Sequence, residues 1–390
     1  MEWVKLGDCF EFIRNGANIK QFDGDGIPIT RIETIARGEI DLTKVGYADL
    51  HYPSYKDYYL KVGDILMSHI NSVTHLGKSA LVTKEISTGF IIHGMNLLCL
   101  RPKKQQNPLY IKYFFESKVF KRQLYKITKK SVNQASFNIK DLKSLKIPNV
   151  TQNDQLRIVK ELSCIRNVIA KRREQIDALD ALVESVFQGL LDSPNLKEVV
   201  LNDVILEKPC RLDSENEEPI SYFDISSVNN KTHDIISEKT ICKVEDRPGR
   251  AKQLIQSNDI LVSNVRPNLK NIAYFRFDSS FTPVASTGFT VLRAVSSKIN
   301  PLFLYSFAIS DEFTNKLMMK STGANYPAVS EKEIRRIRVP LPKLELQNRF
   351  ADYVTSIEAQ KESLRASLSE LETLFDALMQ AAFSGHLNQS

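Results

Sequence analysis

Residues 61–70 read KVGDILMSHI, and residues 256–265 read QSNDILVSNV. The shared DIL lies in a stretch that alternates polar and apolar side chains, which is typical of a β-strand. In the first copy KSALVT (78–83) follows after a polar loop, as the second strand of a hairpin would. Further pairs are KLGD (5–8) and VLND (200–203), NPLYIKYF (107–114) and NPLFLYSF (300–307), IKDLKSLKIP (139–148) and EKEIRRIRVP (331–340), and DALVESVFQGLL (180–191) and DALMQAAFSGHL (376–387).

The distance between paired segments is nearly constant along the chain. It lies between 192 residues, from 139 to 331, and 196 residues, from 180 to 376. A period of this length is too long for one unit of a solenoid and indicates a duplicated domain. Two copies in one chain predict a monomer with approximate two-fold symmetry. In each copy an Asn-Pro pair, at 107–108 and at 300–301, predicts a helix start with Asn as the cap and Pro in the first turn.

A heptad pattern follows the proline-containing segment that ends each copy. In each copy ten positions follow one another at alternating intervals of four and three residues, and nine of the ten are apolar. This pattern predicts coiled-coil helices. Such an apolar seam needs a partner, and because a globular domain lies between the two helices, we expect an antiparallel pair. Arg172 and Lys361 interrupt the seam, and they either extend to solvent or set the register and meet acidic residues of a partner. The seam positions are Ile158, Leu162, Ile165, Ile169, Arg172, Ile176, Leu179, Val183, Val186 and Leu190, and Phe350, Val354, Ile357, Lys361, Leu364, Leu368, Leu371, Phe375, Leu378 and Ala382.

Composition narrows the class of protein only coarsely. The 390 residues leave room for two or three domains. The net charge of +7 permits a polyanionic partner without requiring one. No stretch approaches the roughly 18 apolar residues of a membrane span, and the N-terminus lacks the pattern of a signal peptide. The five cysteines are far apart and include no C-x-x-C pair, which indicates reduced thiols in a cytoplasmic protein.

Motifs for catalysis are missing from the sequence. NPLY (107–110) is close to the N-P-P-Y loop of adenine methyltransferases, in which a flipped base stacks on the aromatic ring. Leu109 replaces the second proline, however, and no glycine-rich cofactor loop is present, so a helix cap is the better interpretation. No P-loop motif occurs, and none of the six histidines has the spacing of a metal site. We therefore expect no catalytic residue, no cofactor and no metal, and the protein is not expected to be an enzyme.

The two junctions between domain and helix carry a resemblance to a known family. They read SVNQASFNIKDLKSLKIPNVTQNDQLRIV (131–159) and TGANYPAVSEKEIRRIRVPLPKLELQNRF (322–350). These junctions, the ending AFSGHL and the order domain, helix, domain, helix resemble the specificity subunit of type I restriction-modification systems over essentially the whole chain. The first junction differs in lacking the second proline and the acidic residue of PLPKLELQ.

The resemblance implies an α+β fold with two similar α/β target-recognition domains. They would be separated by two long helices that form an antiparallel coiled coil, with pseudo-two-fold symmetry. The expected segments are a first target-recognition domain at 1–149, a central spacer helix at 150–192, a second target-recognition domain at 193–342 and a C-terminal spacer helix at 343–390.

The same resemblance implies a function. Each recognition domain would read one half of a split, asymmetric sequence in double-stranded DNA. The helices would space the halves and bind two adenine-N6 methyltransferase subunits, and restriction/translocase subunits would complete the complex. The chain itself would catalyse nothing. A complex with a methyltransferase alone, a coiled-coil scaffold that binds no DNA and a self-contained methyltransferase remain as alternatives, and the missing cofactor loop disfavours the last.

Candidate DNA-reading residues lie in the loops that follow DIL, where the two copies diverge. The loops are HINSVTHLGK (69–78) and NVRPNLK (264–270), and different loops on one scaffold suit two domains that read different half-sites. Arginine pairs bidentately with guanine and asparagine with adenine, although ordinary polar turns remain the alternative. The candidates are Asn71, Thr74, His75 and Lys78 in the first copy, and Asn264, Arg266, Asn268 and Lys270 in the second.

A second pair of candidate loops precedes the junctions, KKSVNQASF (129–137) and KSTGANYPAV (320–329). Their lysines suit phosphates and their other polar residues suit the groove, with a solvated turn as the alternative. These candidates are Lys129, Lys130, Asn133 and Gln134, and Lys320, Asn325 and Tyr326. VEDRPGRAK (244–252) offers Arg247, Arg250 and Lys252 for phosphate contact. The tyrosines of HYPSYKDYYL (51–60) are better suited to packing beneath a loop than to DNA contact.

Overall fold

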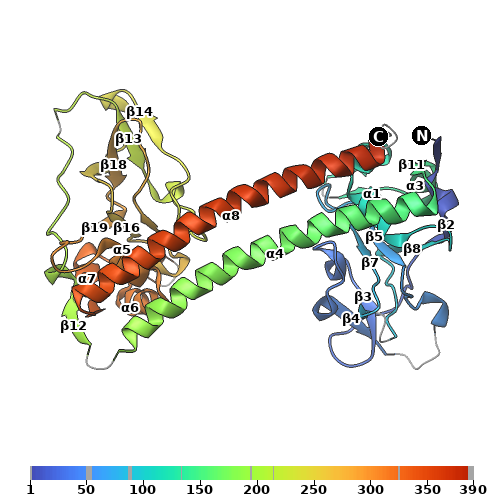
Figure 1. Cartoon of the computed structure of the whole chain (residues 1–390), viewed down its shortest axis with the longest axis horizontal. Coiled ribbons are helices and arrows are strands. Elements are labelled where there is room, and N and C mark those ends of the chain that lie inside the picture. Colours follow the sequence, from blue (N-terminus) through green and yellow to red (C-terminus); the bar gives the residue numbers. More distant parts are fainter. Residues whose placement is uncertain are drawn as a thin grey trace. The chain divides into compact units, whose positions relative to one another are not determined.

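The computed structural model describes residues 2–49, 55–86, 90–132, 134–193, 196–213, 215–323 and 326–384 (Figure 1). The chain forms two compact units. Unit 1 comprises Met1–Glu174 and Ala366–Ser390, and unit 2 comprises Gln175–Arg365. Each unit contains one globular copy of the repeat together with part of each long helix.

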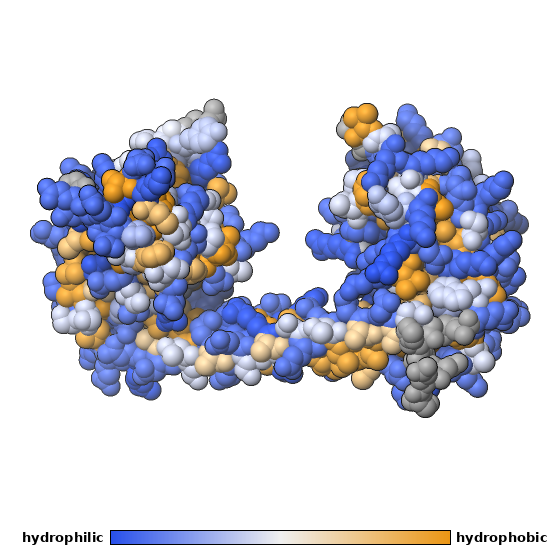
Figure 2. Space-filling view, turned by 90° about the horizontal axis from the view of Figure 1, so that it is seen from above, coloured by the Kyte–Doolittle hydropathy of each residue, from blue (hydrophilic) through white to orange (hydrophobic). Residues whose placement is uncertain are grey.

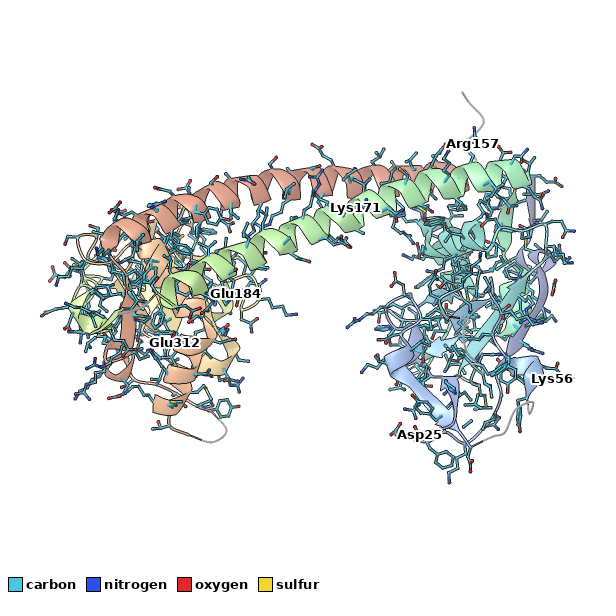
Figure 3. The ribbon with its side chains drawn as sticks, turned by 60° about the horizontal axis from the view of Figure 1, so that its bottom comes forward. Asp25, Lys56, Arg157, Lys171, Glu184 and Glu312 are labelled. Atoms are coloured by element: carbon cyan, nitrogen blue, oxygen red, sulfur yellow. The ribbon has the colours of Figure 1, made fainter. Side chains whose placement is uncertain are left out.

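Unit 1 is built on an antiparallel sheet with the strand order β2-β8-β5-β7. β5 (Ile65–Ser68) contains the apolar part of the DIL segment, is buried along its length and pairs with β7 (Ser79–Leu81), which confirms the predicted hairpin. β3 and β4 lie at the end of the unit away from α4, as Asp25 and Lys56 do in Figure 3. The other elements are β1 (Glu2–Lys5), β2 (Phe10–Asn15), β3 (Ile27–Thr30), β4 (Val45–Ala48), β8 (Leu97–Pro102), β11 (Lys146–Asn149), α1 (Pro108–Glu116), α2 (Lys118–Ile127) and α3 (Ile139–Ser144).

Unit 2 has a three-stranded counterpart of the main sheet, with the order β17-β16-β19, and adds a four-stranded sheet, whereas unit 1 has smaller sheets such as β3-β4 besides its main one. β16 (Ile260–Ser263) is the counterpart of β5 and pairs with β17 (Ile272–Tyr274) and β19 (Phe289–Leu292). The added sheet has the order β14-β13-β18-β15, in which β13 and β18 run parallel. The other elements are β12 (Lys197–Val200), β13 (Ile220–Phe223), β14 (Lys239–Ile241), β15 (Ala251–Leu254), β18 (Thr282–Ser286), β20 (Arg338–Leu341), α5 (Pro301–Ile309), α6 (Asp311–Lys320) and α7 (Glu331–Arg335).

The predicted caps of α1 and α5 are confirmed. The Asn107 side chain accepts a hydrogen bond from the Leu109 N–H at 2.9 Å, and Asn300 accepts one from the Leu302 N–H at 2.9 Å. A proline occupies the first turn of both helices. NPLY is therefore the start of a helix, and its Tyr110 ring is buried in the core.

The aspartate of DIL has the same structural role in both copies. Asp64 forms an ion pair with Arg101 at 2.7 Å, and Asp259 forms one with Arg293 at 2.7 Å. Both carboxylates are buried, and each also accepts a backbone N–H three residues earlier in the chain. A buried carboxylate needs such partners, because an unpaired one would be strongly destabilising. The repeated aspartate therefore fixes the start of β5 and of β16.

A buried glutamine fixes the start of each long helix. In α4 (Gln152–Leu191) the Gln155 side chain accepts the Asn107 N–H at 2.7 Å and donates to the Val150 carbonyl at 3.2 Å. In α8 (Leu344–Ser384) Gln347 accepts the Asn300 N–H at 2.9 Å and donates to the Pro342 carbonyl at 2.7 Å. The two helices therefore leave their domains in the same way, although the first junction lacks the second proline.

The two long helices run antiparallel. Unit 1 contains the start of α4 and the end of α8, and unit 2 contains the end of α4 and the start of α8. In unit 1 the Phe383 ring lies 5.2 Å from that of Tyr110, and in unit 2 the Phe187 ring lies 5.5 Å from that of Phe303. Every predicted seam position of both helices is buried or half-buried, which confirms the heptad pattern.

Lys361 resolves one of the two open questions about the seam. Its side chain is 5% exposed, and its ammonium lies 2.5 Å from the Asp180 carboxylate of α4 and 2.7 Å from Glu358. Burial alone would lower the pKa of Lys361, but the hydrogen bonds to Asp180 and Glu358 outweigh it and raise the pKa. Extension into solvent is therefore wrong for Lys361, and the acidic partner is α4 of the same chain.

Among the described residues, no helix is both long and apolar enough to cross a membrane.

Candidate nucleic-acid interface

The two candidate loops of unit 1 meet in one small sheet. β6 (Ile70–Asn71) pairs with β10 (Ala135–Ser136), and β10 pairs with β9 (Lys129–Lys130). The Phe137 N–H donates to the His69 carbonyl at 3.2 Å and continues this pairing. Loops that are about 60 residues apart in the sequence therefore form a single surface.

Several polar side chains of this surface are exposed or half-exposed. Asn71 is half-buried, and its side chain donates to the Ser68 hydroxyl at 3.2 Å and accepts the Ser72 N–H at 2.8 Å. His75 is half-buried, whereas Thr74, Lys129, Lys130 and Gln134 are exposed. Asn133 lies outside the described residues. Both polar atoms of the Asn71 side chain are therefore used within the protein, and the two lysines and Gln134 are the more accessible groups of this surface.

Unit 2 brings its two candidate loops together in the way that unit 1 does. Val265 and Thr322 both form β-bridges with Ala328. The Arg266 N–H donates to the Pro327 carbonyl at 2.7 Å, and the Val329 N–H donates to the Asn264 carbonyl at 2.8 Å. The two units therefore share one design, in which the loop after the DIL strand pairs with the loop before the helix junction.

Arg266 and Tyr326 form the exposed tip of the unit 2 surface. The guanidinium carbon lies 4.4 Å from the centroid of the tyrosine ring, and the ring itself is 70% exposed. Arg266 has a φ of 49°, in the left-handed region that non-glycine residues rarely adopt, and Pro267 follows it. Asn268 is exposed beside them, and Asn325 lies outside the described residues. Backbone and stacking thus hold an arginine with its hydrogen-bonding edge available.

Besides Asn71 and Thr74, five further candidate side chains form hydrogen bonds or ion pairs within the protein. Each of them would have to exchange a partner in order to reach DNA. Lys78 donates to the Ala36 carbonyl at 2.8 Å, Lys270 pairs with Asp311 at 2.6 Å, Lys320 pairs with Glu333 at 3.0 Å, Arg247 donates to the Asn216 carbonyl at 2.6 Å, and Asn264 accepts the Thr290 hydroxyl at 2.6 Å. Arg250 and Lys252 are exposed.

Two tyrosines of residues 55–60, Tyr58 and Tyr59, are used for packing, whereas Tyr55 is exposed. Tyr58 and Tyr59 pack against a core cluster that includes Ile29 and Ile92, and the Tyr58 ring lies 5.4 Å from that of His93. This confirms the predicted packing role for these two tyrosines. Residues 51–54 lie outside the described part of the chain.

His69 lies directly beneath the unit 1 surface. Its side chain is buried against Phe137, and its Nδ1 has no hydrogen-bond partner among the described residues. Burial lowers the pKa of His69, because a charged imidazole would lose its hydration there. The neutral ring therefore supports the loops at neutral pH.

A charged network in unit 1 attaches α1 to α4. Glu116 binds both Lys112 and Arg166, and the Arg166 guanidinium lies over the Tyr113 ring at 4.5 Å. Burial would raise the pKa of Glu116, but the two cations outweigh it and lower the pKa. The network lines a cavity of about 1010 Å³ with Arg173 and Glu372, which pair at 2.5 Å. Because these opposite charges are paired, the cluster is suited to joining elements.

The candidate surfaces are polar, as is most of each unit. In Figure 2 hydrophilic side chains cover most of the visible surface, and apolar side chains form smaller patches.

The cations of α2 were not among the sequence candidates. Lys121 and Arg122 nevertheless lie three and four residues after Lys118, and Lys126 lies four residues after Arg122, a spacing that places them on one helix face and could have identified them.

Comparisons with known proteins agree with this architecture. Residues 1–179 and 196–373 match the family model for the type I restriction modification DNA specificity domain. The MjaX type I restriction enzyme specificity subunit of Methanocaldococcus jannaschii is 31% identical over 412 residues, which cover 98% of this chain and 92% of the relative.

Two solved structures share the fold. One comes from work on complex assembly and conformational transition of the type I R-M system, with a TM-score of 0.59, 17% identity and coverage of 99% of this chain and 98% of that chain. The other is the type I restriction-modification S subunit from M. genitalium, with a TM-score of 0.56, 16% identity and coverage of 98% and 96%. With both copies of the repeat matched, and a relative of this identity over nearly its whole length, the chain belongs to the type I restriction-modification DNA specificity family.

Proposed function

We propose that this chain is the specificity subunit of a type I restriction-modification complex and reads a bipartite, asymmetric site in double-stranded DNA. Each unit reads one half-site, and the chain directs methyltransferase and restriction subunits to it. One observation carries this proposal above the others. Each unit places two loops of divergent sequence side by side on a shared scaffold, through β6 and β10 in unit 1 and through Val265 and Ala328 in unit 2.

The chemistry of the two surfaces favours different half-sites. In unit 2 the stacked Arg266 is suited to the O6 and N7 acceptors of guanine in the major groove. Unit 1 has no arginine at its described loop tip and offers Asn71, Thr74 and Gln134 instead, with Lys129 and Lys130 for phosphates. Different side chains on equivalent loops would give the two halves different sequences.

The antiparallel helix pair suits a symmetric set of partners. α4 and α8 leave their domains through equivalent glutamine contacts, which supports equivalent partner surfaces on the two helices. Two adenine-N6 methyltransferase subunits would bind these surfaces, and restriction/translocase subunits would join them in the cytoplasm. The chain would supply recognition, and the chemistry would belong to the other subunits.

A domain exchange tests the proposal. Residues 1–149 are replaced by the corresponding domain of a relative with another recognition sequence, and methylated adenines are mapped in a host that expresses the complex. We expect only one half of the methylated sequence to change. The reciprocal exchange of residues 193–342 is the matched control, and it should change only the other half.

Two results would contradict the proposal. A change of both halves by a single exchange would show that the units do not read DNA independently. Methylation that ignores sequence in the wild-type complex would point to a scaffold that binds no DNA specifically.

A further inference from the structure

The second helices of the two domains pack alike but differ in charge. The N-caps Ser117 and Ser310 correspond, and behind them Phe120 and Leu124 of α2 are buried as Phe313 and Leu317 of α6 are. The outward positions differ. Lys118, Arg122 and Lys126 of α2 stand where α6 has the exposed Asp311, Asn315 and Met319, and the exposed Lys121 stands where α6 has the buried Thr314.

Packing therefore does not account for the cations of α2. Helix α6 keeps the same buried pair without them and even carries Glu312, labelled in Figure 3, on its first turn. Arg122 lies four residues from both Lys118 and Lys126, and like charges at this spacing repel each other and weaken a helix. A surface that keeps such repulsion without a packing role is suited to an anionic partner.

The α2 basic face consists of Lys121, Arg122, Lys126, Lys129 and Lys130. All five side chains are exposed, and among the described residues no carboxylate lies within 4 Å of their charged groups. Lys118, by contrast, already pairs with Asp376 at 2.9 Å. The first three line a shallow depression together with Lys118 and Tyr125, whose ring is 65% exposed.

This face is continuous with the candidate interface of unit 1. The Lys130 ammonium lies 4.9 Å from the centroid of the Tyr125 ring, so β9 and α2 form one surface. The loop of residues 69–78 rests on the same helix, because a Cβ added at Gly77 would approach Leu124 Cδ2 to 2.3 Å. DNA bound at these loops would therefore lie beside the α2 basic face.

We propose that the α2 basic face binds the phosphate backbone of the DNA that adjoins the half-site read by unit 1. Unit 1 then supplies most of the sequence-independent affinity, and unit 2 depends more on its base contacts. This inference rests on the proposed function. It goes beyond it by assigning a surface outside the recognition loops and an unequal role to the two units. An acidic protein surface is the competing occupant, and the test separates the two.

The test removes charge without touching the recognition loops. A variant with Lys121→Gln, Arg122→Gln and Lys126→Gln is compared with wild type in the complex with its methyltransferase subunits. Affinity is measured between 50 and 200 mM salt on two duplexes. One carries the sequence found by methylation mapping and is called the mapped duplex, and the other has a random sequence. Each neutralised phosphate contributes about 0.9 to the slope of log affinity against log salt. We expect the slope to fall by about 2–3, with equal losses on both duplexes.

Two matched variants of α6 complete the design. Asn315→Ala with Met319→Ala removes side chains from the positions equivalent to Arg122 and Lys126, and it should leave the slope unchanged. Asn315→Arg and Met319→Lys together give unit 2 the cations of Arg122 and Lys126, and the slope should become steeper on both duplexes. Because every substituted position is exposed, we expect each variant to fold, and thermal unfolding of each one checks this.

The outcomes distinguish this inference from the proposed function. An unchanged slope in the α2 variant overturns the inference, and so does a loss confined to the mapped duplex. Loss of methyltransferase subunits with an unchanged slope would assign the face to an acidic protein surface and would also overturn it. Failure of the proposed function has another signature, because wild type itself would then not prefer the mapped duplex over the random one.

Discussion

The Arg266 guanidinium lies over the Tyr326 ring, with Cζ 4.4 Å from the ring centroid. The two residues come from different loops of unit 2, which are joined by the hydrogen bond from the Arg266 N–H to the Pro327 carbonyl at 2.7 Å. An arginine whose face is covered by a ring keeps its N–H groups at the edge for a planar partner such as guanine. The pair is therefore our best-defined candidate for base reading in the described part of the chain.

Arg266→Ala should weaken discrimination at one base position. The loss of one bidentate contact corresponds to about 1–3 kcal/mol of preference for the mapped sequence over a single-base variant. Affinity for random DNA should change little. The measurement is a set of binding curves on duplexes that differ at one position at a time.

Arg250→Ala is the control, because this exposed arginine is a candidate for phosphate contact. It should reduce affinity for mapped and random duplexes alike and flatten the salt dependence. Equal losses on both duplexes for Arg266→Ala would instead reduce Arg266 to a phosphate contact or a structural residue.

The sequence was sufficient to predict the architecture, because the deciding patterns are local or repeated. Periodic apolar residues in α4 and α8 and the Asn-Pro starts of α1 and α5 depend only on neighbours a few residues away. The pairing of Asn71 with Ala135 is different, since it joins segments far apart in the chain, and no periodicity encodes it. Comparison of the two copies of the repeat nevertheless identified each of the two loops as a candidate for DNA contact.

Residue types could not predict which candidate side chains form ion pairs or hydrogen bonds within the protein. Lys270 and Lys320 have the composition of phosphate-binding lysines, yet each forms an ion pair within unit 2. Their partners Asp311 and Glu333 are distant in sequence, and an exposed lysine and a paired one look alike in a sequence. Arg247 is similar, because it is directed to the carbonyls of Asn216 and Glu218 by the fold of the chain around it.

Asp180→Asn should destabilise the helix pair. It removes the nearer carboxylate from the buried Lys361 ammonium and leaves Glu358 as the remaining partner. A buried charge that loses a partner is costly, and we expect a loss on the order of 1–3 kcal/mol in the free energy of unfolding. Urea unfolding of the full chain measures it.

Lys361→Met is the informative companion to that variant. It places an apolar side chain in the seam and leaves Asp180 half in water, and such replacements of buried ion pairs are often neutral or stabilising. Asp177→Asn, at an exposed position of the same helix, is the matched control and should have little effect. If Lys361→Met destabilised the chain more than Asp180→Asn did, the ion pair itself would be contributing net stability.

Stability should fall as the pH drops below about 6.5, and His69 should carry part of the effect. Burial lowers the pKa of His69 in the folded chain, so the unfolded chain takes up a proton first as the pH falls. The stabilisation is therefore complete above the unfolded pKa and is lost as the pH falls toward the lower folded pKa. Unfolding midpoints measured from pH 8 to pH 5 should fall less steeply in His69→Asn than in wild type.

Two other histidines, the buried His93 and the half-buried His233, should leave part of the pH dependence in that variant. Burial also lowers the pKa of His93 and of His233. His75→Asn, in the same loop but half-buried, is the control and should retain the wild-type pH dependence. An equal pH dependence in wild type and His69→Asn would mean that His69 is not neutral when folded or is not buried in solution.

The central helix should set the gap between the two half-sites. α4 is continuous from Gln152 to Leu191 and passes from unit 1 into unit 2 without a break. Four residues inserted after Ala178 would add about 6 Å, or nearly two base pairs, and keep the apolar face close to register as a stutter. Methylation mapping should then show both half-sequences retained, with a gap longer by one or two bases.

A two-residue insertion at the same place is the matched control, because it adds length but turns the seam away from its partner. Two residues rotate the following part of the helix by about 200° at roughly 100° per residue, so the side chains beyond Ala178 would face solvent. Phe187 would leave its contacts with Phe303 and Phe350, and folding or assembly should fail. If the four-residue variant methylated DNA with an unchanged gap, flexible connections would set the spacing and the helix would not.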